Sequence, residues 1–250
     1  MNIVNRLWTR ISKDGVSKTI YYCSYVLIDV MRNFIYELVM DLRYSGRMLY
    51  GNQKTPYSHL GAHDIYHTEY AVMPLIFKYV KITPSDILVD VGCGKGRVIN
   101  YWLSKGHRNK IIGLELDPSV AAQTAKQLRK WTNVTIVPGD AVHNLPQEGT
   151  IFYFFNPFSE LKVKQFQKRM LELFHNKPVT IIYYRPKSLY VFKNDNWHIK
   201  VINFERQDGI RSWGRLNKYY ELAIITRDTN QSYDKKQTYI PITRKPKPYR

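Results

Sequence analysis

Short apolar runs and longer amphipathic segments alternate along the middle of the chain. The apolar runs occupy residues 87–91, 110–115, 134–137, 150–155 and 179–184, and turn-forming residues follow them. Between these runs, apolar positions recur at three- and four-residue intervals, which is typical of helices that bury one side. Unbroken apolar strands separated by helices predict a parallel sheet that is covered on both faces.

The pattern changes after residue 184. Segments 197–205 and 218–226 are rich in β-forming residues, and only a polar, glycine-containing link separates them. They predict an antiparallel hairpin at the end of the sheet. Asp117 and Pro118 suit the N-cap and the first turn of a helix. Helices are expected over residues 69–81, 97–105, 118–131 and 159–174.

Two apolar segments precede the sheet. Residues 1–13 have apolar positions at helical spacing among basic residues, and residues 20–42 are strongly apolar but contain four charged side chains. A signal peptide needs an unbroken apolar core, and a membrane-spanning helix needs about 20 mostly uncharged residues, so neither is predicted. We expect a helical extension over residues 1–56 that packs on the domain or on a partner. An interfacial membrane anchor, basic on one face, is the alternative.

The α/β domain is expected to comprise residues 57–228. Residues 229–250 are basic and contain three prolines, a composition typical of a disordered tail.

Charge is distributed unevenly. The 250 residues include 38 Lys+Arg and 20 Asp+Glu, which gives a formal net charge of +18. Residues 1–60 carry 8 basic and 4 acidic side chains, residues 61–160 carry 10 and 9, and residues 161–250 carry 20 and 7. A near-neutral middle and a basic end indicate a catalytic core beside a region that binds something anionic. The two cysteines, Cys23 and Cys93, exclude a disulfide scaffold and a zinc ribbon and favour a reducing, cytoplasmic compartment.

The turn after the first predicted strand reads Asp90-Val-Gly92-Cys-Gly94-Lys-Gly96-Arg97. Open α/β sheets bind ligands at the carboxyl ends of their strands, and glycines there let a ligand approach the main chain. A nicotinamide-dinucleotide fingerprint would need a third glycine where Arg97 stands, and Asp90 is badly placed for a pyrophosphate. Both departures favour a cationic cofactor. The segment resembles motif I of class I S-adenosylmethionine-dependent methyltransferases.

Later strand ends extend the resemblance. Glu115 ends the second strand, 21 residues after Gly94, at the position of the family's acid that binds the ribose hydroxyls. The resemblance implies that Leu116 packs on adenine and that Asp140, followed by Ala141, accepts a hydrogen bond from the adenine amino group. It also implies S-adenosylmethionine as the cofactor and a Rossmann-like, seven-stranded, mostly parallel sheet that ends in the antiparallel hairpin.

The segment Asn156-Pro157-Phe158, after the fourth strand, resembles motif IV of the family. The resemblance implies that the Asn156 amide oxygen and the Pro157 carbonyl accept hydrogen bonds from a substrate N–H, while Phe158 stacks on the target. Nitrogen is favoured as the methyl acceptor, and oxygen stays open because the motif has one proline where the usual family form has two.

Basic and aromatic residues follow motif IV and suit an anionic substrate. The cations can bind the phosphates of a nucleic acid, and the aromatic rings among them can stack on its bases. A solvated basic surface over core aromatics is the alternative. The residues are Lys162, Lys164, Lys168, Arg169, Lys187, Lys193, Arg211, Arg215 and Lys218, with Tyr183, Tyr184, Tyr190, Trp197 and Trp213.

Three functions therefore remain. The favoured one is a methyltransferase whose substrate is anionic or is bound to something anionic, with nucleic acid and a membrane surface both open as partners. The second is an inactive methyltransferase-fold module that docks on nucleic acid or membrane. The third is a nicotinamide-dependent oxidoreductase. The pattern says nothing about oligomeric state.

Three histidines precede the first strand at four-residue spacing. His59, His63 and His67 would line one face of a helix, with Asp64 beside them. Gly61 weakens a helix there and no further ligand can be named, so no metal site is predicted. We expect residues 57–70 instead to fold over the cofactor as a flap, as this segment often does in the family.

Overall fold

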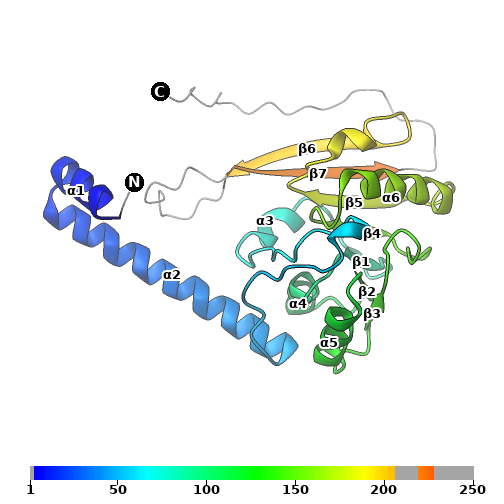
Figure 1. Cartoon of the computed structure of the whole chain (residues 1–250), viewed down its shortest axis with the longest axis horizontal. Helices are drawn as coiled ribbons and strands as arrows, with labels where there is room; N and C mark the ends of the chain where they lie inside the picture. The colour runs from blue at the N-terminus through cyan, green and yellow to red at the C-terminus, as the bar shows by residue number, and fades with distance from the viewer. Residues whose placement is uncertain (1–2, 206–218, 228–250) are drawn as a thin grey trace.

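A seven-stranded sheet forms the centre of the protein, in the order β3-β2-β1-β4-β5-β7-β6 (Figure 1). The computed structural model describes residues 3–205 and 219–227. The strands are β1 (Leu88–Val91), β2 (Ile111–Glu115), β3 (Val134–Pro138), β4 (Ile151–Phe154), β5 (Val179–Tyr184), β6 (His198–Glu205) and β7 (Tyr219–Arg227). Strands β1 to β5 are parallel, and β7 runs antiparallel between β5 and β6. The predicted mostly parallel sheet and its terminal hairpin are confirmed.

Helices lie on both faces of this sheet. They are α1 (Ile3–Asp14), α2 (Val16–Ser45), α3 (Met73–Phe77), α4 (Arg97–Ser104), α5 (Pro118–Leu128) and α6 (Glu160–Leu173), with the short 3-10 helices η1 (Ser58–Leu60) and η2 (Leu189–Phe192). Asp117 caps α5, because its side chain accepts from the main-chain N–H groups of Ser119 and Val120. The N-cap predicted from the sequence is therefore confirmed.

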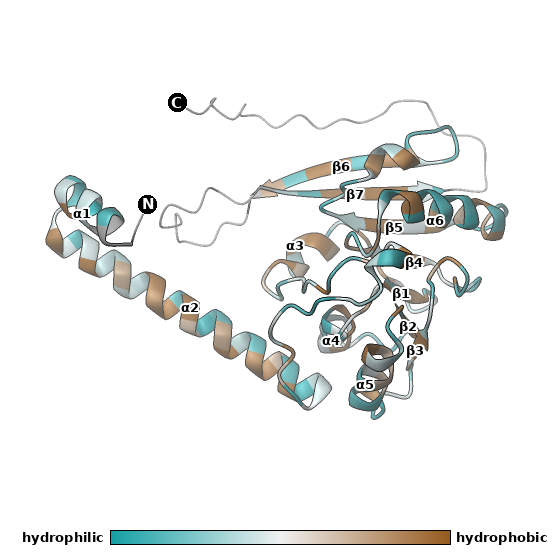
Figure 2. Ribbon diagram, in the orientation of Figure 1, coloured by the Kyte–Doolittle hydropathy of each residue, from teal (hydrophilic) through white to brown (hydrophobic). Residues whose placement is uncertain are grey.

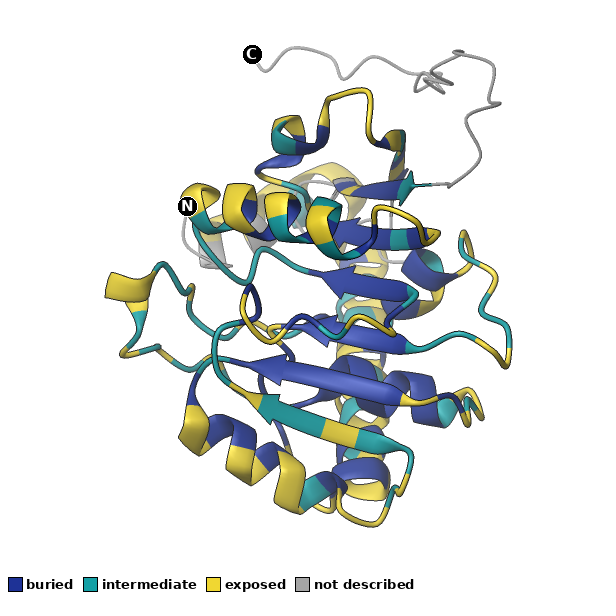
Figure 3. Cartoon of the chain, turned by 90° about the vertical axis from the view of Figure 1, so that its right-hand side faces the viewer, coloured by how far each residue is buried: buried dark blue, intermediate teal, exposed yellow. Residues whose placement is uncertain are grey.

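The core consists of two apolar layers, one on each face of the sheet. Ile76 of α3 and Trp102 of α4 belong to one layer, and Phe166 of α6 belongs to the other. All residues of β1, β2 and β4 are buried, whereas the edge strand β3 is partly exposed (Figure 3). This burial explains why the central strands are continuous apolar runs in the sequence.

The helix expected over residues 69–81 is much shorter in the structure. Only Met73–Phe77 is helical, with Pro74 in the first turn. Proline suits a first turn but breaks a helix interior, so the helix cannot begin as early as Glu69. The preceding residues are held by side-chain contacts instead, since the Thr68 hydroxyl lies 2.7 Å from the Tyr153 hydroxyl.

The N-terminal extension is a helical hairpin. Helices α1 and α2 contact each other and join at Gly15, whose φ of 81° suits glycine. The C-terminal part of α2 packs on α4 and α5, whereas its N-terminal part projects away from the sheet (Figure 1). No described helix is both long and apolar enough to cross a membrane.

The predicted domain boundaries at residues 56 and 228 stay predictions. The tail expected over residues 229–250 lies outside the described residues, as do Arg211, Trp213, Arg215 and Lys218.

Candidate cofactor and substrate site

A cavity of about 700 Å³ lies at the carboxyl ends of β1 to β4. It gathers residues from Asn52 to Lys187, which are 135 positions apart in the sequence, and nearly all of the predicted site residues line it. Those that line it are Asp90, Gly92, Gly94, Glu115, Leu116, Asp140, Ala141, Asn156, Pro157 and Phe158. Gly96 does not line the cavity, and with a φ of 85° it forms the N-cap of α4.

The glycine-rich turn is packed tightly between two other segments. A Cβ at position 92, where φ is 75°, would lie 2.5 Å from Cβ of Pro157. A Cβ at position 94, where φ is 51°, would lie 2.8 Å from Cγ2 of Ile65. Both glycines are therefore needed for conformation and for the close approach of motif IV and of the flap.

Two buried carboxyl groups lie on the floor of the cavity. Asp90 and Glu115 are 3% and 7% exposed. Burial, and then the charge of Glu115, raises the pKa of Asp90 to about 8. Burial also raises the pKa of Glu115, although its carboxylate accepts from the main-chain N–H groups of Gly94 at 2.9 Å and Asp117 at 3.0 Å. At neutral pH Asp90 therefore holds a proton and can donate a hydrogen bond as well as accept one.

Asp140 is paired with a lysine that was expected to face the substrate. Its Oδ2 lies 2.6 Å from Nζ of Lys162, and its Oδ1 accepts from the main-chain N–H of Val142 at 2.9 Å. Burial acts to raise the pKa of Asp140, but these hydrogen bonds outweigh it and hold that pKa below its usual value. The interpretation of Lys162 as a free substrate cation is corrected: its ammonium group is bonded to Asp140.

Asn156 has an unusual backbone conformation and a side chain that is bonded through both its oxygen and its nitrogen. Its φ of 41° is left-handed, a conformation that asparagine tolerates better than most residues. Its Oδ1 accepts from the Tyr183 hydroxyl at 2.8 Å and from the Lys187 N–H at 3.2 Å, and its Nδ2 donates to the Arg185 carbonyl at 2.6 Å. Arg185 is also left-handed, with a φ of 49°. In this conformation the amide oxygen predicted to receive a substrate N–H already has two protein donors.

The predicted flap lies against motif IV. His63 donates its main-chain N–H to the Pro157 carbonyl at 3.0 Å, and its Nδ1 lies 3.0 Å from the Asn156 carbonyl. The Ser159 N–H donates to the Gly61 carbonyl at 2.7 Å. Flap residues 58, 60 and 62–68 line the cavity, so this segment forms one of its walls. The Phe158 ring is half-buried, and it packs edge-on against Phe154.

The three histidines do not share a helical face. The helix there is only the 3-10 turn Ser58–Leu60, and His59 contacts the Pro56 carbonyl within this turn. His67 lies 2.9 Å from the Gly51 carbonyl, and burial, then the charge of Arg97, lowers the pKa of His67 to about 4. The described residues contain no group of three or more His, Cys, Asp or Glu side chains arranged to bind a metal.

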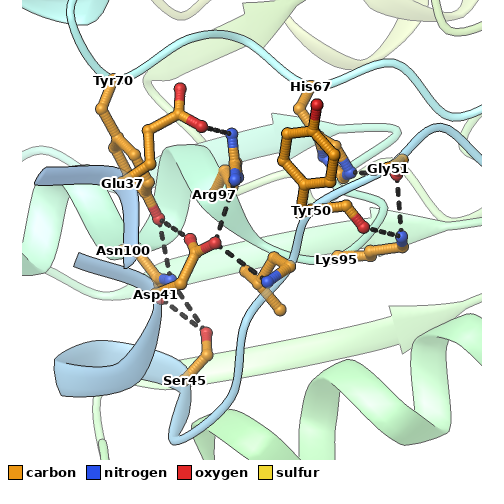
Figure 4. A network of polar contacts seen from close by, with 11 residues as sticks. Glu37, Asp41, Ser45, Tyr50, Gly51, His67, Tyr70, Lys95, Arg97 and Asn100 are labelled. Atoms are coloured by element: carbon orange, nitrogen blue, oxygen red, sulfur yellow. Dashed lines mark hydrogen bonds and ion pairs between the residues drawn. The ribbon is translucent and has the colours of Figure 1, made fainter. Parts of the chain in front are cut away.

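Arg97 joins the glycine-rich turn to the N-terminal extension, a link that the sequence does not reveal. The guanidinium group is 6% exposed and lies 2.9 Å from Asp41, which is fully buried, and 3.3 Å from Glu37 (Figure 4). Asp41 also accepts from the Tyr70 hydroxyl at 2.8 Å and from the Leu49 N–H at 2.9 Å. The sequence gives only one sign of this link: Arg97 stands where a nicotinamide-dinucleotide fingerprint would have its third glycine.

Further bonds strengthen the same junction. Asn100 donates to the Ser45 hydroxyl at 2.8 Å, and Lys95, from the glycine-rich turn, donates to the Gly51 carbonyl at 2.9 Å (Figure 4). Both cations of the turn, Lys95 and Arg97, therefore bind the N-terminal part of the chain.

Most of the expected aromatic stacking surface is core. Tyr183, Tyr184 and Trp197 are buried, so the alternative interpretation of the aromatic residues as core is confirmed for these three, while Tyr190 is 49% exposed. Lys164 pairs with Glu160 and Arg169 pairs with Glu172 on the exposed face of α6. The exposed cations that line the cavity are Arg185 and Lys187, and these two residues form its basic rim.

The sheet order and the glycine-rich turn at the end of β1 define an α/β protein of the Rossmann-like class. Residues 88–177 match a family model described as a methyltransferase domain. This part of the chain is therefore similar to methyltransferase domains.

Individual relatives match more weakly. Over 78 residues the chain is 31% identical to ribosomal RNA small subunit methyltransferase A of Thermotoga petrophila, a stretch that is 31% of this chain and 28% of that protein. The chain thus spans less than a third of the length of this curated relative.

Two solved structures are also similar. The Bacillus subtilis M1A22 tRNA methyltransferase TrmK is 12% identical, with a TM-score of 0.49 over 65% of this chain and 67% of that one. An RNA methyltransferase from Salinibacter ruber, in complex with S-adenosyl-L-homocysteine, is 16% identical, with a TM-score of 0.47 over 70% of this chain and all of that one. Because both TM-scores are below 0.5, we base no inference on either structure.

Proposed function

We propose that this protein transfers the methyl group of S-adenosylmethionine to a nucleophile on RNA. The observation that carries the proposal is that one cavity, at the carboxyl ends of β1 to β4, gathers the residues of four separate motifs. A volume of about 700 Å³ is within the range of cofactor pockets.

The residues in the cavity fit the cofactor chemically. Glu115 keeps acceptor capacity beside its two backbone donors and is proposed to bind the ribose hydroxyls. Leu116 and Ala141 offer apolar contact for adenine, and Asp140, fixed by Lys162, is proposed to accept from the adenine amino group. Asp90 and the glycine-rich turn are proposed to bind the remainder of the cofactor.

Little covalent chemistry is then required of the protein. The sulfonium group supplies a methyl that is already activated for transfer. The protein contributes by aligning the nucleophile and excluding water, and alignment of reacting groups can supply roughly 7–11 kcal/mol. The flap, as a wall of the cavity, is proposed to exclude water.

Charge supports a nucleic-acid substrate. The rim residues Arg185 and Lys187 are exposed, and residues 161–250 carry 20 basic side chains against 7 acidic ones. Cations at such a rim would bind phosphates. The matching Thermotoga petrophila protein is, by its name, a methyltransferase of ribosomal RNA, which favours RNA over other anions.

The acceptor is proposed to be a nitrogen atom at motif IV. A substrate N–H needs an acceptor, and the main-chain carbonyls of Asn156 and Pro157 are occupied by His63 in this conformation. Substrate entry is therefore proposed to displace His63, after which these carbonyls can orient the substrate and Phe158 can contact its base.

Calorimetric titration with S-adenosylmethionine tests cofactor binding. We expect micromolar binding to the intact chain and none to Gly94→Arg, whose Cβ alone would lie 2.8 Å from Ile65. Gly106→Ala is the matched control, because Gly106 has a similar φ of 78° but no atom within 4 Å of its added Cβ. Circular dichroism must show that both variants are folded. Binding of a nicotinamide dinucleotide instead would contradict the proposal.

Transfer of labelled methyl groups into a fractionated lysate tests the substrate. We expect nuclease, and not protease, to release the label, and mass spectrometry of the digested RNA to find a nitrogen-methylated nucleoside. Label released only by protease would contradict an RNA substrate. Cofactor binding without transfer to any fraction would favour the inactive binding module.

A further inference from the structure

Hydrophobic residues recur along the whole of α2 (Figure 2), and many of their large apolar side chains are exposed. We call a row of these side chains the α2 stripe, and each member leaves between 43% and 65% of its surface exposed. Its members are Ile20, Leu27, Ile28, Met31, Phe34, Ile35 and Leu42.

The spacing of the stripe is that of a helix that packs along another helix. Ile20, Leu27 and Phe34 repeat every seven residues, and so do Ile28, Ile35 and Leu42, with Met31 between the two rows. Two neighbouring rows at heptad spacing form the broad apolar face typical of helices in bundles. The stripe runs for 23 residues, which at 1.5 Å per residue is about 34 Å.

The opposite side of α2 is already covered. Thr19, Asp29, Met40 and Tyr44 are buried there, at intervals that place them on one side of the helix. Helix α1 contacts this part of the molecule through Arg10, whose guanidinium carbon lies 3.6 Å from the centre of the Tyr22 ring. Neither α1 nor the sheet domain covers the stripe, so it is continuous from Ile20 to Leu42.

We propose that a second copy of this chain covers the α2 stripe, so that two α2 helices pack antiparallel about a two-fold axis. A two-fold axis requires the same patch on both partners, and the stripe supplies a self-complementary apolar face. Each α2 holds its own domain near its C-terminal end, and antiparallel packing separates the two domains.

The exposed area matches what a dimer needs. Aromatic side chains present roughly 150–250 Å² each, and large aliphatic side chains present somewhat less. Seven members, each about half exposed, together with the neighbouring exposed Val16, Tyr21, Val30 and Val39, offer on the order of 800 Å² per protomer. A stable interface buries about 800 Å² on each partner.

The charges beside the stripe are compatible with this packing. Asp29 is bonded within α2 to Arg32 and to Asn33. The carboxylates of Glu37 and Asp41 face Arg97. Burial of the stripe would therefore leave none of these three carboxylates without a partner.

A membrane surface is the competing occupant, and the helix fits it less well. A helix that lies in a membrane interface presents a solvated, basic face opposite its apolar face. The face of α2 opposite the stripe is instead partly covered and includes the buried Asp29.

Light scattering coupled to size-exclusion chromatography of the full chain tests the proposal. One chain has a mass of 29.6 kDa, and we expect twice that mass for the wild type at micromolar concentration. Ile28→Glu with Ile35→Glu should halve the mass. The matched control is Leu161→Glu on α6, which replaces an apolar residue that is 67% exposed outside the stripe and should leave the mass unchanged.

Two further measurements make the outcome decisive. Circular dichroism must show equal helix content in the three proteins, and the wild type should not sediment with vesicles of neutral and anionic phospholipids. A monomeric wild type at about 100 µM overturns the proposal, as does a dimer that survives both substitutions in a folded protein. Sedimentation with vesicles that is lost in the double variant would assign the stripe to a membrane surface instead.

Discussion

His63 donates its main-chain N–H to the carbonyl of Pro157 at 3.0 Å, and this bond joins the flap to motif IV across 94 residues of sequence. The imidazole Nδ1 of the same histidine lies 3.0 Å from the neighbouring Asn156 carbonyl. One residue of the flap therefore occupies both main-chain acceptors at the position where the proposed reaction would orient its nucleophile. A substrate N–H at motif IV would therefore either share these carbonyls with His63 or displace it.

Replacing His63 by alanine should loosen the flap. The variant keeps the main-chain bond but loses the contact of Nδ1 with the Asn156 carbonyl, so hydrogen exchange should become faster at the Ser159 N–H, which donates to Gly61. The control is His59→Ala. In the described part of the chain, the one hydrogen bond of the His59 side chain is with the Pro56 carbonyl, so this substitution does not loosen motif IV. Mass-spectrometric exchange of the two variants measures this difference. Equal exchange in both would mean that the imidazole does not hold the flap.

Replacing Asn156 by alanine should abolish turnover and leave cofactor binding intact. The substitution removes the acceptor of the buried Tyr183 hydroxyl, and an unsatisfied buried group typically costs about 1–3 kcal/mol; it also removes a donor from the exposed Arg185 carbonyl, which water can replace. Asn156→Gly tests the backbone separately, since glycine adopts the φ of 41° without strain. Turnover, cofactor titration and urea denaturation should be measured on both variants. Full turnover in either variant would contradict a role for the Asn156 side chain.

The strands were predictable because each depends on a local pattern. The limits of β5, Val179–Tyr184, agree with the apolar run, and the Asp117 cap follows from the two residues Asp117 and Pro118. The residues of the cavity were predictable for a related reason. They lie at the ends of strands whose order determines which loops are neighbours, so a motif in each loop sufficed.

The bonds between distant segments were not predictable in this way. Asp41 and Arg97 are 56 residues apart and meet only because α2 packs on α4. Lys162 was expected to face the substrate because its position on α6 follows from the sequence, whereas its contact with Asp140 depends on how the loop after β3 folds. The composition of residues 20–42 likewise showed that α2 is strongly apolar but could not say which part of it the domain would cover.

The ion pair of Arg97 with Asp41 should be essential for stability. Asp41→Asn leaves the buried guanidinium without its main charge partner, and breaking a buried pair typically costs about 3–5 kcal/mol. Lys110→Ala is the control, because the side chains of its pair with Glu148 are 52% and 46% exposed and such a surface pair contributes about 0–1 kcal/mol. Urea denaturation measures both free energies of unfolding. A similar loss in the two variants would mean that the Arg97 junction is not a structural link.

The contribution of Asp90 to the free energy of unfolding should fall as the pH rises from about 4 to about 8. The pKa of Asp90 is about 8 in the folded chain, against an ordinary value of 3.8, so across this range the folded protein binds a proton that the unfolded chain has lost. Glu115, whose pKa is also raised, contributes in the same direction. The stabilisation is therefore complete below pH 4 and is lost as the pH passes through 8. In the Asp90→Asn variant the side chain at this position cannot ionise, so the free energy of unfolding should change less with pH. Relative to the wild type, the variant should therefore gain stability from pH 5 to pH 9. Urea denaturation at several pH values measures the difference between the two proteins, and a difference that stays constant with pH would show that Asp90 is ionised in the folded protein throughout.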